Sequence, residues 1–98
     1  LKSCGTPHWR LLYPGVRVCP LPVGAGRTRA YLVKMAPGVR VPAHDHKGPE
    51  ITLVLEGGYS DETGTYRRGD LMIADAGLLH SPVADRQAGC VCMIVTAA

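Results

Sequence analysis

GVRVPAHDHKGPEITLVLEG, residues 38–57, is the stretch that decides the fold. His44 and His46 stand two residues apart in it, and Glu50 follows after a short turn sequence at residues 47–49. Residues i and i+2 of a strand lie on one face, with Cα atoms roughly 6.5 to 7 Å apart. Both imidazoles can therefore reach one ion, and Glu50, which opens the next strand, can direct its carboxylate to the same point.

The strand that Glu50 opens has few polar residues on either face. With a period of two, Thr52 and Val54 share the face of Glu50, while Ile51, Leu53 and Leu55 lie on the opposite face. A strand covered on both faces is typical of a closed structure. The pattern therefore predicts that this strand lies inside a sandwich or barrel.

The rest of the chain has the same all-β character. It holds 98 residues, enough for one domain (1–98), and is 46% hydrophobic and 19% charged, with 12 Gly and 8 Pro. Short apolar or alternating runs are separated by turn residues every 8 to 12 residues or so, as in sandwiches and barrels. The predicted strands are residues 9–13, 16–21, 28–35, 41–44, 51–56, 65–66, 71–74, 81–83 and 90–96.

Composition excludes several functional classes. The formal charge is only +3 and the basic residues are scattered, so the sequence predicts no nucleic-acid surface. No apolar run approaches the roughly 18 residues that span a bilayer, and the N-terminus shows no signal pattern, so we expect a cytoplasmic protein without membrane contact. The four cysteines do not have disulfide-framework spacing, and we expect reduced thiols.

His80 is the natural fourth member of the candidate metal site. It follows the apolar run GDLMIADAGLL, in which Gly77 permits a turn before the next strand. Uncompensated burial of three imidazoles and a carboxylate would cost several kcal/mol. A metal ion satisfies all four groups, so we predict a site formed by His44, His46, Glu50 and His80.

The spacing of these residues resembles the two motifs of the cupin superfamily. The first motif, G-x5-HxH-x3,4-E-x6-G, is matched at every fixed position from Gly38 to Gly57. The second, G-x5-PxG-x2-H-x3-N, is matched by its glycines and by His80, but Asp75 and Ala84 replace its proline and asparagine. The resemblance implies a cupin double-stranded β-helix, a jelly-roll barrel, with these four residues as metal ligands.

Residues 50–95 closely resemble the C-terminal cupin-like domain of ChrR-type anti-sigma factors. The specific matches are the SDETG turn at 60–64, the Gly69-Asp70 pair, the segment ADAGLLHSPVAD at 74–85, and a late CxC. The cupin domain of that family holds zinc, so the resemblance implies zinc as the metal here. The resemblance implies a sensory domain that lets an N-terminal domain release an extracytoplasmic-function sigma factor under singlet-oxygen or peroxide stress. The chain begins at Leu1 and has no counterpart of that N-terminal domain. We therefore expect a fragment or a free-standing relative of such a two-domain protein.

The metal and the activity stay open at this point. Four protein ligands favour zinc, whereas an open coordination position would favour Fe, Mn or Ni and catalysis. The alternative function is a small mononuclear cupin oxygenase or a related small-molecule enzyme. A third is a module that binds an organic acid or sugar against the metal. Few acid-base groups accompany the ligands, so we lean towards a sensor.

Further predictions concern the last strand, the sheet edges and one hairpin with its following turn. Cys90 and Cys92 share one face at i and i+2, and are interpreted either as small buried hydrophobes or as a redox pair beside the metal. Exposed edge strands must be covered, so we expect a homodimer. Tyr59 and Tyr66 are expected to pack across one hairpin, and Asp70 to stabilise its own turn.

Overall fold

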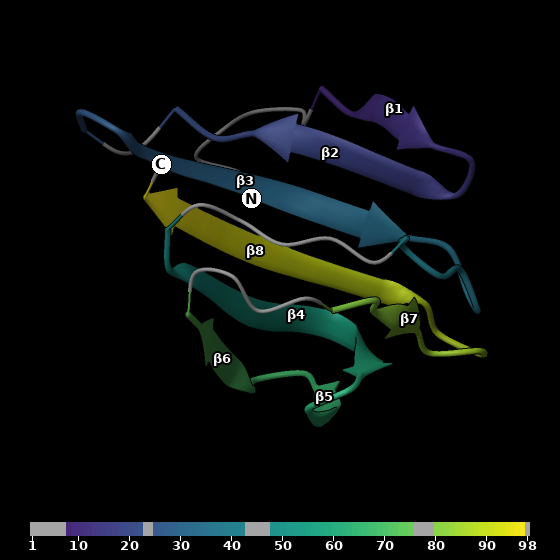
Figure 1. Cartoon of the computed structure of the whole chain (residues 1–98). Coiled ribbons are helices and arrows are strands. Elements are labelled where there is room, and N and C mark those ends of the chain that lie inside the picture. The colour runs from purple at the N-terminus through teal and green to yellow at the C-terminus, as the bar shows by residue number, and fades with distance from the viewer. Residues whose placement is uncertain (1–7, 23–24, 43–47, 76–79, 98) are drawn as a thin grey trace.

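The computed structural model describes residues 8–22, 25–42, 48–75 and 80–97, and their regular structure consists of β-strands (Figure 1). The strands are β1 (Arg10–Tyr13), β2 (Val16–Pro20), β3 (Thr28–Met35), β4 (Glu50–Asp61), β5 (Gly64–Arg67), β6 (Leu71–Ala74), β7 (Val83–Ala84) and β8 (Cys90–Ala97). The all-β prediction is confirmed. Several predicted strands agree with the structure to within a residue or two at each end, because their alternation is strong.

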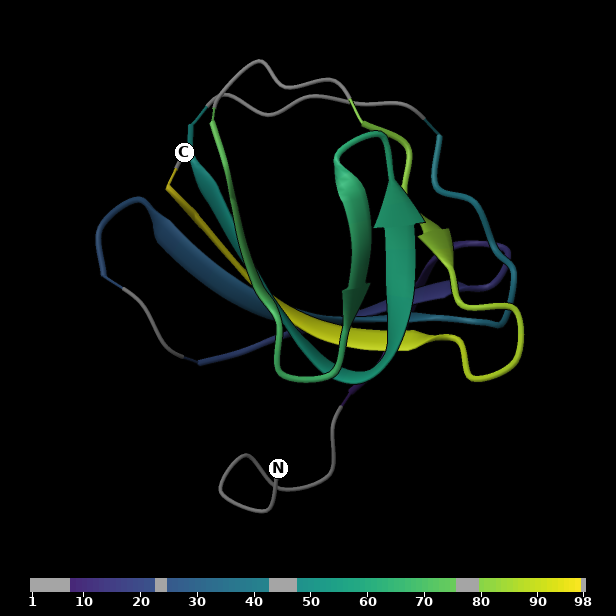
Figure 2. The same cartoon turned by 90° about the horizontal axis from the view of Figure 1, so that it is seen from below.

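The strands form two layers that share β4. One layer has the antiparallel order β1-β2-β3-β8-β4, with β6 on the far side of the first half of β4. The second half of β4 pairs with β5 and β7 instead. Figure 2 shows the first layer curving while the end of β4 turns up beside β5 and β7. One long strand therefore joins both walls of the barrel.

A corner at Gly57 and Gly58 lets β4 change layers. The register against β8 shifts between Val54 and Glu56, which marks a β-bulge. Gly57 has φ +65°, and a Cβ built on it would lie 2.0 Å from the carbonyl oxygen of Gly89. Only glycine allows that approach. The prediction that this strand ends at residue 56 is therefore wrong: the glycine pair bends the strand, which continues to Asp61.

The core lies between the two layers. Val54 of β4 is opposite Cys92 of β8, which is opposite Val33 of β3, and all three side chains are buried. Tyr59 and Tyr66 face each other across β4 and β5 with ring centroids 5.1 Å apart, as predicted. The corner thus brings an aromatic pair against the aliphatic rows of the first layer.

The opposite face of β4 is more open than the sequence predicted. Ile51 is 38% exposed and lies opposite Ile73 of β6, which is 62% exposed. The expectation that both faces are covered is wrong here, because this face of β4 points away from the core between the two layers.

Two predicted strands near the candidate site also differ. Of predicted strand 41–44, Val41 and Pro42 lie outside any strand and the rest lies outside the described residues. Val41 still donates its N–H to the Pro82 carbonyl at 2.8 Å. Predicted strand 81–83 is displaced to β7, Val83–Ala84. The backbone N–H of Ser81 donates to the Glu62 carboxylate instead of to a neighbouring strand.

Candidate metal centre

Glu50 and His80 are the two predicted ligands within the described residues. Glu50 is the first residue of β4, and both side chains are buried, each residue being 8% exposed. The face of Glu50 also carries Thr52 and Val54, as the period of two predicted, and both are buried. His44 and His46 lie outside the described residues. The complete ligand set therefore stays a prediction, and no cluster of three or more metal-binding side chains is found within the described ranges.

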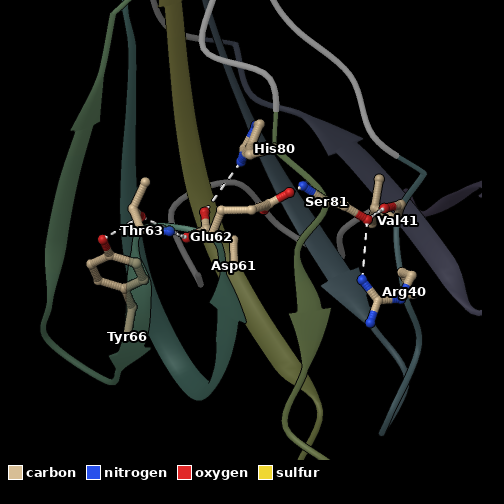
Figure 3. Close-up of polar contacts among 8 residues, drawn as sticks. All are labelled: Arg40, Val41, Asp61, Glu62, Thr63, Tyr66, His80 and Ser81. Carbon is tan, nitrogen blue, oxygen red and sulfur yellow. Dashed lines mark hydrogen bonds and ion pairs between the residues drawn. The ribbon is translucent and has the colours of Figure 1, made fainter.

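His80 is oriented by a buried carboxylate that the sequence did not single out. Its Nδ1 lies 3.3 Å from Oδ2 of Asp61, and the Asp61 side chain is only 1% exposed. A carboxylate can only accept, so Nδ1–H donates and Nε2 lies on the other side of the ring. Figure 3 shows the imidazole standing over Asp61, at the end of β4.

The turn between β4 and β5 holds this arrangement in place. Oδ1 of Asp61 accepts the Thr63 N–H at 2.8 Å and the Thr63 hydroxyl lies 2.6 Å from the same oxygen. The neighbouring Glu62 accepts the N–H of Ser81 at 3.0 Å. Asp61 and Glu62 thus contact His80 and Ser81 respectively, and each partner lies 19 positions further along the chain.

Further hydrogen bonds extend the network on both sides (Figure 3). The Ser81 hydroxyl donates to the carbonyl of Val41 at 2.6 Å, which ties the same segment to the end of the 25–42 range. On the other side, the Thr63 hydroxyl lies 2.6 Å from the Tyr66 hydroxyl. The sequence indicated SDETG only as a turn. Nothing in its spacing shows which distant segment its carboxylates face.

These contacts change the acidity of both carboxylates. Burial by itself raises the pKa of Asp61, but the hydrogen bonds from Thr63 and the contact with His80 outweigh it, so the pKa lies below its usual value. The pKa of Glu62 is also lowered, first by the Ser81 N–H. Both groups are therefore carboxylates, and hence acceptors, at neutral pH.

The predicted sharing of one face by Cys90 and Cys92 is confirmed, and both are buried free thiols. A hydrogen bond between them lowers the pKa of Cys90 and raises that of Cys92. Burial and the negative charge of Glu50 raise the pKa of Cys92 further. Burial, with Glu50 and Cys92 adding to it, also raises the pKa of Tyr31 to about 12. Glu50 and the thiol pair therefore share one electrostatic environment.

The donor chemistry of the described site suits a divalent ion. A buried carboxylate and a buried imidazole are oxygen and nitrogen donors that zinc and other divalent transition metals take. Buried charges in proteins are paired or bind metal, because leaving them uncompensated is costly. The carboxylate contact at Nδ1 is the usual partner of a histidine that binds metal through its other nitrogen. Glu50 and His80 therefore fit the predicted role.

Comparison with known families decides the wider assignment. The family model described as the ChrR cupin-like domain matches residues 2–98, almost the whole chain. This chain belongs to the ChrR cupin-like domain family.

Other members and structural neighbours agree with this ChrR cupin-like assignment. The anti-sigma-E factor ChrR of Cereibacter sphaeroides is 47% identical over 89 residues, which are 91% of this chain and 41% of that protein. The crystal structure of Rhodobacter sphaeroides SigE in complex with the anti-sigma ChrR matches with a TM-score of 0.84 and 46% identity, covering 90% of this chain and 47% of that one. This chain thus spans less than half the length of either.

A more distant structure supports the fold alone. KdgF from a Halomonas species matches with a TM-score of 0.78 at 21% identity, over 93% of this chain and 86% of that one. Together with the cupin-like family match and the likeness to an RmlC-like cupin protein from Ralstonia eutropha (TM-score 0.77, 20% identity, over 93% of this chain and 64% of that one), this confirms the cupin jelly-roll prediction. Within the ranges that the structure describes, no helix is long and apolar enough to cross a membrane.

Proposed function

We propose that this domain binds one zinc ion through His44, His46, Glu50 and His80 and acts as the sensory half of a ChrR-type anti-sigma factor. The observation that carries the proposal is the burial of Glu50 and His80, a carboxylate and an imidazole, in a domain of this family. A zinc ion held by four protein ligands supplies folding free energy and no open position for substrate. In this proposal its loss, or damage to its ligands, reports the stress.

The metal part of the proposal is tested by elemental analysis of the purified protein. We expect about one equivalent of zinc, as for a structural site with four protein ligands. His46→Ala, His80→Ala and Glu50→Ala should each lose it. Two matched controls exist in the same chain: exposed His8 for the histidines, and Glu56, on the same strand, for Glu50. Iron or manganese in place of zinc would favour the oxygenase, and metal retained by all three variants would refute the site.

The sensory part needs a second domain, which we take to lie N-terminal to this one and to bind the sigma factor. A chimera tests it: this chain replaces the cupin-like domain of the Cereibacter sphaeroides ChrR, which is 47% identical. With a reporter of the cognate sigma factor, we expect repression that singlet oxygen relieves. The chimera carrying His80→Ala should fail to repress even without singlet oxygen, because it has already lost the ion. An equal response from both chimeras contradicts a sensing role for the metal site.

Cys90 is the thiol that we propose reacts first with peroxide. Its pKa is lowered by the hydrogen bond from Cys92, which favours the thiolate over the thiol. The thiolate attacks one peroxide oxygen, and an S–O bond forms as the O–O bond breaks. The leaving alkoxide or hydroxide takes a proton from solvent and departs as alcohol or water, which leaves a sulfenic acid on Cys90. Because Glu50 influences the acidity of Cys92, oxidation here would disturb the environment of a metal ligand. In the chimera, Cys90→Ser should abolish the response to peroxide while leaving zinc content unchanged.

A further inference from the structure

Asp61 is a buried acidic group in contact with the predicted ligand His80, and the predicted ligand set does not include it. Its side chain is almost completely shielded from solvent, yet its Oδ2 is directed at Nδ1 of His80 at 3.3 Å. A buried carboxylate is costly to retain unless its oxygens are occupied. The position of both oxygens therefore indicates what Asp61 does.

The carboxylate is held in one orientation by its own turn. Oδ1 is occupied by the backbone N–H of Thr63 at 2.8 Å and by the Thr63 hydroxyl at 2.6 Å. That hydroxyl is in turn fixed by the Tyr66 hydroxyl, whose ring packs on Tyr59. Oδ2 consequently has a fixed direction, and the aromatic pair of the β4–β5 hairpin sets it.

A histidine that binds metal through one nitrogen needs the other nitrogen protonated and held. Partners that do this are carboxylates, carbonyls or water, and they select the tautomer and the ring orientation. We propose that Asp61 is a positioning residue for the metal site: it keeps the proton of His80 on Nδ1 and presents Nε2 as the donor atom. This inference rests on the proposed zinc site. It assigns the hairpin turn at residues 60–64 a role in metal affinity.

Asp61→Asn tests the proposal with little disturbance of the turn. The asparagine carbonyl can still accept from Thr63, which leaves the amide NH₂ facing His80 in place of Oδ2. An amide donor there requires Nδ1 to accept, so the proton must move to Nε2. Glu62→Gln is the matched control, because it removes one negative charge from the same turn while its amide oxygen can still accept the Ser81 N–H.

Two measurements distinguish positioning from simple structural support. Long-range proton–nitrogen NMR of the metal-free protein should show the Nδ1–H tautomer of His80 in the wild type and in Glu62→Gln, and the Nε2–H tautomer in Asp61→Asn. Zinc affinity, measured by competition with a chelator, should fall about 10- to 100-fold in Asp61→Asn. It should stay unchanged in Glu62→Gln.

The outcomes separate this inference from the proposed function. If the wild type binds no zinc, or His80→Ala binds as well as the wild type, the zinc site itself is wrong. If His80→Ala loses zinc while Asp61→Asn keeps both the affinity and the tautomer of the wild type, only the positioning role is overturned. Should Asp61→Asn not fold, Thr63→Val loosens the carboxylate without touching His80. It should lower zinc affinity by less than the loss in His80→Ala, and an unchanged affinity there also overturns the proposal.

Discussion

Replacing Gly57 by alanine tests the corner that joins the two walls of the barrel. Gly57 has φ +65°, and the added Cβ would lie 2.0 Å from the Gly89 carbonyl oxygen. The matched control is Gly26→Ala, because Gly26 has nearly the same backbone, φ +61°, but no heavy atom within 4 Å of the added Cβ. The difference between the stability losses of the two variants therefore measures the cost of the close approach without the cost of the left-handed conformation.

The expected loss of stability follows from these contacts. The left-handed backbone alone costs an alanine about 1–2 kcal/mol, which is the whole effect expected for Gly26→Ala. In Gly57→Ala the oxygen must also retreat from 2.0 Å to at least the 3.4 Å of ordinary contact. Gly89 has little room to move, because a Cβ on it would itself lie 2.5 Å from the Met35 carbonyl oxygen.

The retreat breaks a hydrogen bond as well. The Gly58 N–H donates to the same Gly89 oxygen at 3.0 Å. A broken buried hydrogen bond costs about 1–3 kcal/mol, so the total for Gly57→Ala is about 2–5 kcal/mol. That is a large share of the stability of a domain of this size, which is about 5–15 kcal/mol.

Urea unfolding of the metal-free proteins, followed by circular dichroism, measures both losses. With a slope of about 1.5 kcal/mol per molar urea, Gly26→Ala should lower the midpoint by about 1 M and Gly57→Ala by about 2 M. Equal shifts for the two variants would refute the reasoning, because they would mean that the corner relaxes freely. Gly57→Ala should also weaken zinc binding, since the corner positions Asp61 next to His80.

Three further outcomes are expected. Val54→Ala empties part of the core, where Val54 is 2% exposed, and should cost about 2–3 kcal/mol in the same urea assay. Asp85→Ala should destabilise at pH 7 and by less as the pH falls below about 4: N–H groups of its own turn hold the pKa of Asp85 below its ordinary 3.8, so its stabilisation is present above that value and is lost as the pH falls through the folded-state pKa. Thermal midpoints across that range check this, and Asp85→Asn, which carries no charge, should lack the pH-dependent part of the stabilisation. Alkylation of metal-free protein with iodoacetamide should label Cys90 before Cys92, because only Cys90 has a lowered pKa; peptide mass spectrometry showing the reverse order would contradict the assigned direction.

The local sequence pattern alone was enough to predict the fold class and the residues that share a strand face with Glu50. A period of two requires that Glu50, Thr52 and Val54 share one side of a strand. The pattern did not show which side is buried: the side with the apolar residues between them is the more open one. The same argument placed Cys90 and Cys92 together. These features could be predicted because a period of two is a local property of the backbone.

Only the tertiary structure showed how β4 continues and what faces His80. A glycine pair at the end of an apolar run is equally compatible with a strand end and with a bend, and the Gly89 carbonyl that decides between them is remote in sequence. Asp61 and His80 are likewise 19 residues apart, in segments whose own patterns indicate only turns. The period of two by itself determined which residues of β4 and of β8 share a side of a strand, whereas the metal ligands stay a prediction from the sequence. The contact of Asp61 with His80 depends on the bend of β4 and the packing of its hairpin, which are non-local and are settled only when the two layers close.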